Sequence, residues 1–187
     1  MIKNIIKKFQ IRFFWITLER FPNLFRPSSK PYLSGDTLRN FSDHVFDESK
    51  SIKPNSIKKK DVVFVSSDVI DIFFNTVYED IKNEFVLITH NSDTNINKHH
   101  LEKIDSRVIH WFAQNLSQQS SEKVSFIPIG LENLRRLKHG RRKWFANPTN
   151  SKTKNILSSF NEFTNFKERG EINSFFEENE LVDNKTY

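Results

Sequence analysis

Four short apolar runs in the middle of the chain constrain its fold more than any other feature. Each run has the length of a buried strand and is too short for a buried helix. The polar stretches between them leave room for helices, which we expect at residues 68–82 and, shorter, at 98–105. Strands that alternate with helices are typical of a parallel sheet, so the sequence predicts an α/β fold with a Rossmann-like parallel sheet in residues 61–145. The runs are Val62–Val65, Phe85–His90, Val108–Ala113 and Val124–Ile127.

The flanks of this domain divide into three further segments. Residues 1–21 form a basic amphipathic segment, residues 22–60 a polar connector, and residues 146–187 a linker with the start of a second α/β unit. In the last segment we expect a strand at 155–160 and a helix at 166–179. One strand and one helix cannot bury both faces of a sheet. Either the second unit is therefore incomplete, or its helix packs back onto the first sheet.

The first 21 residues combine lysines with apolar side chains at helical spacing, namely at positions 2, 5, 6, 9, 13 and 16. This pattern predicts a helix that lies on an anionic lipid surface or, alternatively, a first helix packed on its own domain. No uninterrupted apolar run approaches the roughly 18–20 residues that a transmembrane helix needs. A small-residue cleavage site after a clean apolar run is also lacking, which argues against a signal peptide.

The chain has no cysteine among its 187 residues. This excludes a disulfide framework, a thiolate nucleophile, a cysteine-ligated zinc site and an iron–sulfur cluster. Any catalysis therefore depends on histidine, carboxylate, hydroxyl or backbone groups. An aromatic content of 13% argues against a wholly disordered chain, although 28% of the residues are charged.

The net charge of +6 is unevenly distributed along the chain. Residues 1–60 carry 13 Lys and Arg against 5 Asp and Glu, whereas residues 61–120 carry 4 against 9. Six further cations fall between positions 135 and 143, where they form either a contact for phosphate groups or a solvated basic face. Basic flanks suit an anionic surface, and they disfavour nucleic acid because the cations do not form one interleaved patch.

The candidate site residues follow the predicted strands, because an open parallel sheet binds its ligands beyond the carboxyl ends of its strands. The first cluster is Thr89–Asp93. His90 is a candidate general base, and Asp93 is placed to accept a hydroxyl proton or to orient the histidine. The alternative for this cluster is loop capping, since Asn, Ser and Asp side chains often bond nearby backbone amides.

Two further clusters follow the next two strands. Gln114 and Asn115 offer donors and acceptors for sugar hydroxyls, with Trp111 or Phe112 either packing on a sugar ring or belonging to the core. The third cluster contains a glycine that permits a sharp turn or a close approach to a ligand, and two hydroxyl-binding candidates. These are Gly130, Glu132 and Asn133. Neither a dinucleotide-binding glycine motif nor a P-loop occurs, and an Asp-x-Asp motif is also lacking.

Taken in order, these stretches resemble the motif series of exostosin-like glycosyltransferases of surface-polysaccharide biosynthesis. The matching stretches span about residues 30–170. They are Tyr32–Arg39, Phe85–Asp93, Ile109–Asn115, Ile127–Asn133, Ser159–Asn165 and Lys167–Arg169.

The resemblance implies a two-domain architecture with a nucleotide-sugar bound between two Rossmann-like halves. The chain corresponds to the amino-terminal half with an incomplete second half, so we expect a truncated product that is inactive alone. No cofactor is implied beyond the nucleotide-sugar donor, and no metal site. The implied catalytic residues are His90, Asp93 and, as a secondary base, Asp36. The implied substrate-binding residues are Asn91, Asn115, Gly130, Glu132, Asn133 and, for the donor phosphate, Arg169.

The expected function is the transfer of a sugar from a nucleotide-sugar to a glycan or lipid-linked acceptor. The expected location is cytoplasmic, with peripheral contact to a membrane surface through the basic amino-terminal segment. The alternative is a non-catalytic basic module that binds nucleic acid or an anionic surface. Binding to nucleic acid would weaken steeply with salt and would need no sugar nucleotide.

Overall fold

The structure is a computed structural model that describes residues 26–118, 121–136, 142, 145, 156–158, 166–176 and 182–184. The chain divides into two compact units, residues 1–142 and residues 143–187. The predicted amphipathic segment 1–21 lies outside the described residues. Among those that are described, no helix combines the length and the apolar character that crossing a bilayer requires.

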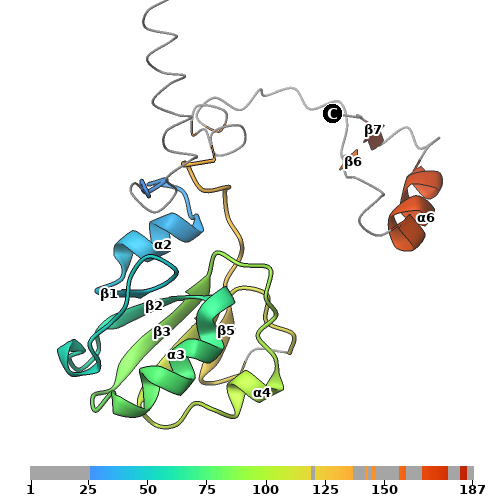
Figure 1. Cartoon of the computed structure of the whole chain (residues 1–187). Coiled ribbons are helices and arrows are strands. Elements are labelled where there is room, and N and C mark those ends of the chain that lie inside the picture. Colours follow the sequence, from blue (N-terminus) through green and yellow to red (C-terminus); the bar gives the residue numbers. More distant parts are fainter. Residues whose placement is uncertain are drawn as a thin grey trace, which may run out of the picture. The chain divides into compact units, whose positions relative to one another are not determined.

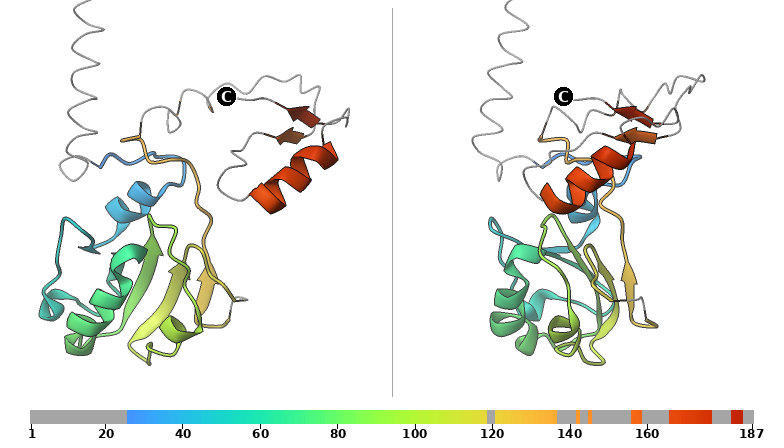
Figure 2. Two further views of the ribbon diagram at one scale, coloured as in Figure 1. Left: turned by 45° about the vertical axis from the view of Figure 1, so that its right-hand side comes forward. Right: turned by 90° about the vertical axis from the view of Figure 1, so that its right-hand side faces the viewer.

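The first unit contains a five-stranded sheet in which every strand is parallel to its neighbours (Figure 1). The strand order follows the chain order, β1-β2-β3-β4-β5. The arrowheads in Figure 2 point toward the end of the sheet at which α2 lies. We call this carboxyl edge of the sheet the rim. The strands are β1 (His44–Phe46), β2 (Val62–Ser66), β3 (Phe85–His90), β4 (Val108–Ala113) and β5 (Val124–Phe126).

One face of the sheet packs against α3 (Ile70–Thr76), which lies between 3₁₀ turns at Ser67–Val69 and Tyr78–Asp80. Aromatic rings make much of this contact: the Phe74 ring centroid lies 6.0 Å from that of Trp111 and 5.2 Å from that of Tyr78. The connection from β3 to β4 carries the short helix α4 (Lys98–Leu101), capped by the side chain of Asn97. This face holds the larger part of the apolar core.

The opposite face is covered in part by α2 (Gly35–Phe41). The helix begins after Ser34, whose side chain accepts a hydrogen bond from Thr37 N, as a helix-capping serine does. Leu38 packs against Phe64 and Ile88 in a second, smaller apolar cluster. Because α2 lies on the face of the sheet opposite α3, the chain segment that precedes β1 reaches the rim from that opposite face.

The predicted strands correspond to β2–β5, and the helix expected at 68–82 is divided into α3 and the two 3₁₀ turns that flank it. The α/β fold with a parallel sheet is therefore confirmed. The segment assigned to a polar connector, residues 22–60, differs: it supplies α2, β1 and a 3₁₀ turn at Pro54–Ser56. The sheet thus begins before residue 61.

The second unit contains a strand, a helix and a strand (Figure 1). Strands β6 (Ile156–Ser158) and β7 (Val182–Asn184) pair in parallel, with α6 (Phe166–Phe176) between them in the chain. The strand and helix expected at 155–160 and 166–179 correspond to β6 and α6. Strand β7 was not predicted from the sequence, and it pairs with β6 to form a parallel two-stranded sheet.

Candidate functional site

The polar segments that follow β3, β4 and β5 meet at the rim. Asn133 Nδ2 donates a hydrogen bond of 2.8 Å to Asn91 Oδ1, which joins the segments after β5 and β3. Gln114 Nε2 and Asn115 Nδ2 both donate to the Ser92 carbonyl oxygen, at 3.1 and 3.0 Å. These bonds join the segment after β4 to the segment after β3. The three clusters identified in the sequence therefore form one contiguous site.

The start of α2 adds a fourth segment to this site. The backbone N–H of Asp36 donates to Asn133 Oδ1 at 2.7 Å, and Asn91 Nδ2 donates to Asp36 Oδ1 at 3.1 Å. Asp36, Asn91 and Asn133 thus form a closed ring of hydrogen bonds, which we call the rim ring. The order of the strands has no reversal that would form a crevice within the sheet. The polar centre instead lies where α2 meets the strand ends.

Asp36 also lies among arginine side chains. Arg135 Nε is 3.3 Å from Asp36 Oδ2, and Arg26 Nη1 is 3.8 Å from Asp36 Oδ1. Burial raises the pKa of the Asp36 carboxyl, although Arg135 and Arg26 oppose the shift. A raised pKa suits a general base, but the Asp36 side chain is 0% exposed and offers no surface to a substrate hydroxyl. The arrangement favours a role for Asp36 in positioning the rim.

His90 is also buried, at the end of β3, and is 2% exposed. Its Nδ1 accepts a hydrogen bond from Asn91 N at 2.8 Å, so Nε2 carries the proton that faces the Pro128 carbonyl oxygen at 3.3 Å. Burial lowers the pKa of the imidazole, which keeps the ring neutral. Because the lone pair of Nδ1 is already engaged, this arrangement favours a positioning role for His90 over the expected role as a base.

Two glycines permit the close contacts of the site. A Cβ at Gly35 would lie 1.7 Å from Asn91 Oδ1 and 2.5 Å from His90 Nδ1. A Cβ at Gly130, whose φ is +72°, would lie 2.4 Å from the Leu33 carbonyl oxygen. Gly130 therefore serves the approach of two backbone segments, with Leu131 N donating to the Leu33 carbonyl oxygen at 2.8 Å.

Among the candidate site residues at the rim, side chains that reach solvent are those of Asp93, Glu132 and, half-buried, Asn91 and Asn115. Glu132 Oε1 accepts a hydrogen bond from Asn133 N at 3.1 Å, which ties this exposed carboxylate to the rim ring. Asn115 adopts a left-handed backbone with φ of +53°. These side chains offer both carboxylate and amide groups to a ligand, which is the chemistry that binds sugar hydroxyls.

The aromatic residues of β4 have different surroundings. Trp111 is fully buried, and its Nε1 donates to Thr89 Oγ1 at 2.9 Å, so this ring belongs to the core. Phe112 is 36% exposed and its ring centroid lies 4.6 Å from that of His110. Of the two rings considered for packing on a sugar, Trp111 is therefore inaccessible.

Sequence reasoning missed the arginines that surround Asp36. Arg26 lies in a segment read as a connector, and its side chain is 2% exposed. Arg135 belongs to the cationic stretch 135–143, which looked like a phosphate contact or a solvated face, yet its side chain is only 13% exposed. The pairing of a lone acidic residue in one segment with an arginine far along the chain leaves no local signal.

Arg169 lies on α6 in the second unit and is half-buried. Its contact with a donor phosphate stays a prediction. In the described parts of both units, no group of three or more His, Asp or Glu side chains is arranged to hold a metal ion.

The lowered pKa of His90 predicts that acid destabilises the fold. The unfolded chain takes up a proton near pH 6.5, before the folded protein does, so the free energy of unfolding falls as the pH drops below that value. The slope approaches about 1.4 kcal/mol per pH unit for each proton. His100 has the same direction of shift and contributes with the same sign.

We expect His90→Gln to reduce this slope, because the glutamine amide keeps a donor for the Pro128 carbonyl and does not titrate. Urea unfolding of both proteins at several pH values between 5.5 and 7.5 measures it. A slope unchanged in the variant would show that His90 is not a buried neutral group.

Comparison with known proteins adds no family assignment: no protein-family model and no curated protein matches this chain. The α/β fold and the geometry of the rim are therefore what the functional argument rests on.

Proposed function

We propose that the chain carries a sugar-transfer site at the rim, of the kind found in glycosyltransferases that use a nucleotide-sugar donor and a glycan or lipid-linked acceptor. One observation supports this most: four polar segments, from α2 and from the ends of β3, β4 and β5, are joined by hydrogen bonds at the carboxyl edge of a parallel sheet. Ligands of open parallel sheets bind at this edge. The exposed groups there are carboxylates and amides, as sugar hydroxyls require.

The proposal divides the site residues into two groups. Asp36, His90 and Asn133 are buried and hold the segments in place. Asp93 and Glu132 are exposed and contact the sugars, with Asn91 and Asn115 beside them at half-burial. The three residues predicted to be catalytic thus differ in exposure. Asp36 and His90 are buried, whereas a hydroxyl group can reach Asp93.

In the proposed reaction, the acceptor hydroxyl oxygen forms a bond to the anomeric carbon of the donor sugar. The bond from that carbon to the diphosphate oxygen breaks, and the nucleoside diphosphate leaves with the bonding electron pair. The Asp93 carboxylate accepts the hydroxyl proton. Cationic groups near the departing diphosphate stabilise its charge. Arg136 is available for this role, because it is exposed and follows Asn133 of the rim ring in the sequence.

The first test is whether a nucleotide-sugar stabilises the protein. A ligand at one hundred times its Kd raises the free energy of unfolding by about 2.7 kcal/mol, which a panel of nucleotide-sugars in a thermal-shift assay detects. We expect stabilisation by at least one member. In Asp93→Ala and in Glu132→Ala, we expect the apparent Kd for the nucleotide-sugar to rise by about tenfold, because each variant loses a contact with a hydroxyl group.

A matched control is Glu122→Ala. Glu122 is exposed and precedes β5, at the edge of the sheet opposite the rim, so its loss should leave the apparent Kd unchanged. Hydrogen exchange adds a second measurement, with ligand-dependent protection expected at residues 89–93 and 128–133. The proposal is contradicted if no nucleotide-sugar stabilises the protein, or if all three variants respond alike.

A further inference from the structure

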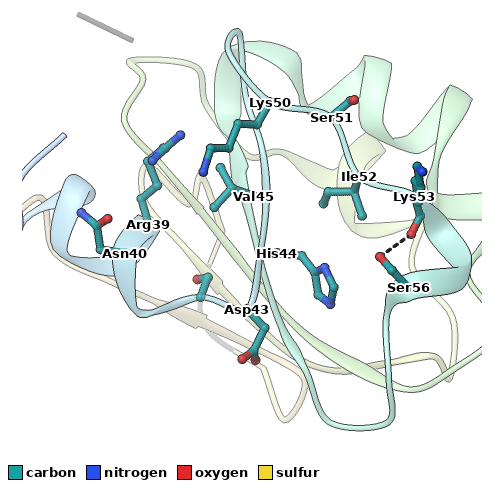
Figure 3. Close-up of a pocket in the computed structure, with 11 residues that line it drawn as sticks. Arg39, Asn40, Asp43, His44, Val45, Lys50, Ser51, Ile52, Lys53 and Ser56 are labelled. Carbon is teal, nitrogen blue, oxygen red and sulfur yellow. Dashed lines mark hydrogen bonds between the residues drawn. The ribbon is translucent and has the colours of Figure 1, made fainter. Parts of the chain in front are cut away.

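A groove on the first unit lies beside the edge strand β1, and its described lining contains no residue of the rim ring (Figure 3). Its volume is about 550 Å³, within the range of small-molecule sites. It is bounded by the end of α2, by β1 and by the segment from Lys50 to Ser56. The lining side chains that bear on its chemistry are Arg39, Asn40, Asp43, Lys50, Ser51 and Lys53.

Arg39 forms the fixed cationic wall of this groove. Its side chain is 7% exposed and is held by two bonds: Nε donates to Asp47 Oδ2 at 2.7 Å, and Nη2 donates to Ser49 Oγ at 3.4 Å. Within the described residues, Nη1 of Arg39 has no acceptor. A guanidinium that is anchored through two nitrogens presents the third with little loss of conformational entropy.

Two lysines bring further positive charge to the same groove. Lys50 and Lys53 are exposed, and across the described part of the chain neither ammonium group pairs with a carboxylate. Figure 3 shows the Lys50 side chain turned toward the end of Arg39. The one carboxylate in the lining, Asp43, accepts a hydrogen bond from Val62 N at 2.9 Å. Because Arg39 is paired with Asp47, the excess of positive charge in the groove comes from Lys50 and Lys53.

The backbone of β1 adds a neutral donor. Asp43 N donates to the Val62 carbonyl oxygen, on the side of β2. Because successive residues of a strand turn their backbone groups to opposite sides, the N–H of His44 points to the outer edge, where no strand from the described residues pairs with β1. The Ser51 hydroxyl lines the same space. Asn40 and Ser56 also line it, but Asn40 Nδ2 donates to the Arg26 and Asp36 carbonyl oxygens and Ser56 Oγ donates to the Lys53 carbonyl oxygen.

We propose that this groove binds a small ligand that carries a phosphate group, with Arg39 Nη1 and the ammonium groups of Lys50 and Lys53 as its cationic contacts. Phosphate oxygens are strong acceptors that arginine and lysine bind through charge-assisted hydrogen bonds. The Ser51 hydroxyl and the backbone N–H of His44 complete the set of donors. The described lining residues of this groove are different from the residues proposed to contact the sugars at the rim.

Pyrophosphate titrated into the full chain at low salt, followed by calorimetry, tests the proposal. We expect binding that weakens at least tenfold in Lys50→Glu and in Lys53→Glu. Both side chains are exposed, so the variants should keep the fold, which circular dichroism checks. The matched control is Lys82→Glu, an exposed lysine that does not line the groove and whose replacement changes the net charge equally.

Equal weakening in all three variants would mean that pyrophosphate responds to net charge alone, and it would overturn the proposal. Failure of the wild-type chain to bind pyrophosphate would do the same. Vesicles containing phosphatidylglycerol identify the source of the phosphate. Binding to vesicles that is lost in Lys50→Glu but kept in Lys82→Glu indicates a lipid headgroup, and vesicle binding that is equal in both indicates a soluble ligand.

Discussion

Replacing Gly35 by alanine should lower the free energy of unfolding by about 3 kcal/mol. The added Cβ would lie 1.7 Å from Asn91 Oδ1, so the Asn91 side chain has to move. Its Oδ1 accepts from Asn133, and its Nδ2 donates to Asp36. Moving it breaks two bonds of the rim ring and leaves buried partners unsatisfied, each at a cost of about 1–3 kcal/mol. Urea unfolding of the wild type and the variant measures the change.

Gly170→Ala provides the matched control for Gly35→Ala. Gly170 lies within α6, and a Cβ there would meet nothing within 4 Å. Alanine is a better helix former than glycine by about 1 kcal/mol, so stability should stay unchanged or rise. A loss of less than about 0.5 kcal/mol in Gly35→Ala would contradict the contact between α2 and the end of β3. The rim ring would then not be part of the native fold.

The central strands were predictable because each combines apolar runs with β-branched or aromatic residues. β2 and β3 are buried on both faces or nearly so, whereas β4 exposes Ile109 and Phe112; all three are apolar enough to stand out from the polar segments around them. β1 did not stand out, because it is three residues long and begins with a histidine. An edge strand pairs with only one neighbouring strand, so a few residues are enough to form it. Such a short run is hard to recognise in the sequence.

That the three polar segments lie together was predictable from the geometry of a parallel sheet. The strands are parallel, so the segments after β3, β4 and β5 had to meet at one edge, and hydrogen bonds donated by Asn115 and Asn133 join them there. The exposure of each side chain was not predictable. His90 and Asp93 are three residues apart, yet His90 is 2% exposed and Asp93 is exposed. The difference comes from tertiary contacts: the His90 ring lies against Gly35 and the Pro128 carbonyl oxygen.

Asp36 shows most directly what could not be predicted from the sequence. In the sequence it is an acidic residue in a polar segment, and its burial depends on Arg135, 99 positions further along the chain. The hydrogen bond from its backbone to Asn133 spans 97 positions. No local pattern records such a pairing, because the partners become neighbours only when the sheet has formed between them.

Asp36→Ala should lower the free energy of unfolding by about 3–5 kcal/mol, the cost of breaking a buried charge pair. The change removes the carboxylate that lies 3.3 Å from Arg135 and 3.8 Å from Arg26. Arg26 keeps Asp47 and Glu48 as partners, so the cost falls mainly on Arg135. It also removes the acceptor of Asn91 Nδ2. Urea unfolding measures the loss, and Asp36→Asn, which keeps an acceptor oxygen but no charge, should fall between the alanine variant and the wild type.

Asp93→Ala separates this structural role from the proposed chemistry. Asp93 is exposed, so its removal should change the free energy of unfolding by no more than about 0.5 kcal/mol while it weakens the response to nucleotide-sugars. Asp36→Ala should instead cause a large loss in the free energy of unfolding, although no substrate contacts Asp36. If Asp36→Ala instead keeps its stability and loses only the response to nucleotide-sugars, Asp36 reaches the ligand. The buried arrangement would then have to open during the reaction.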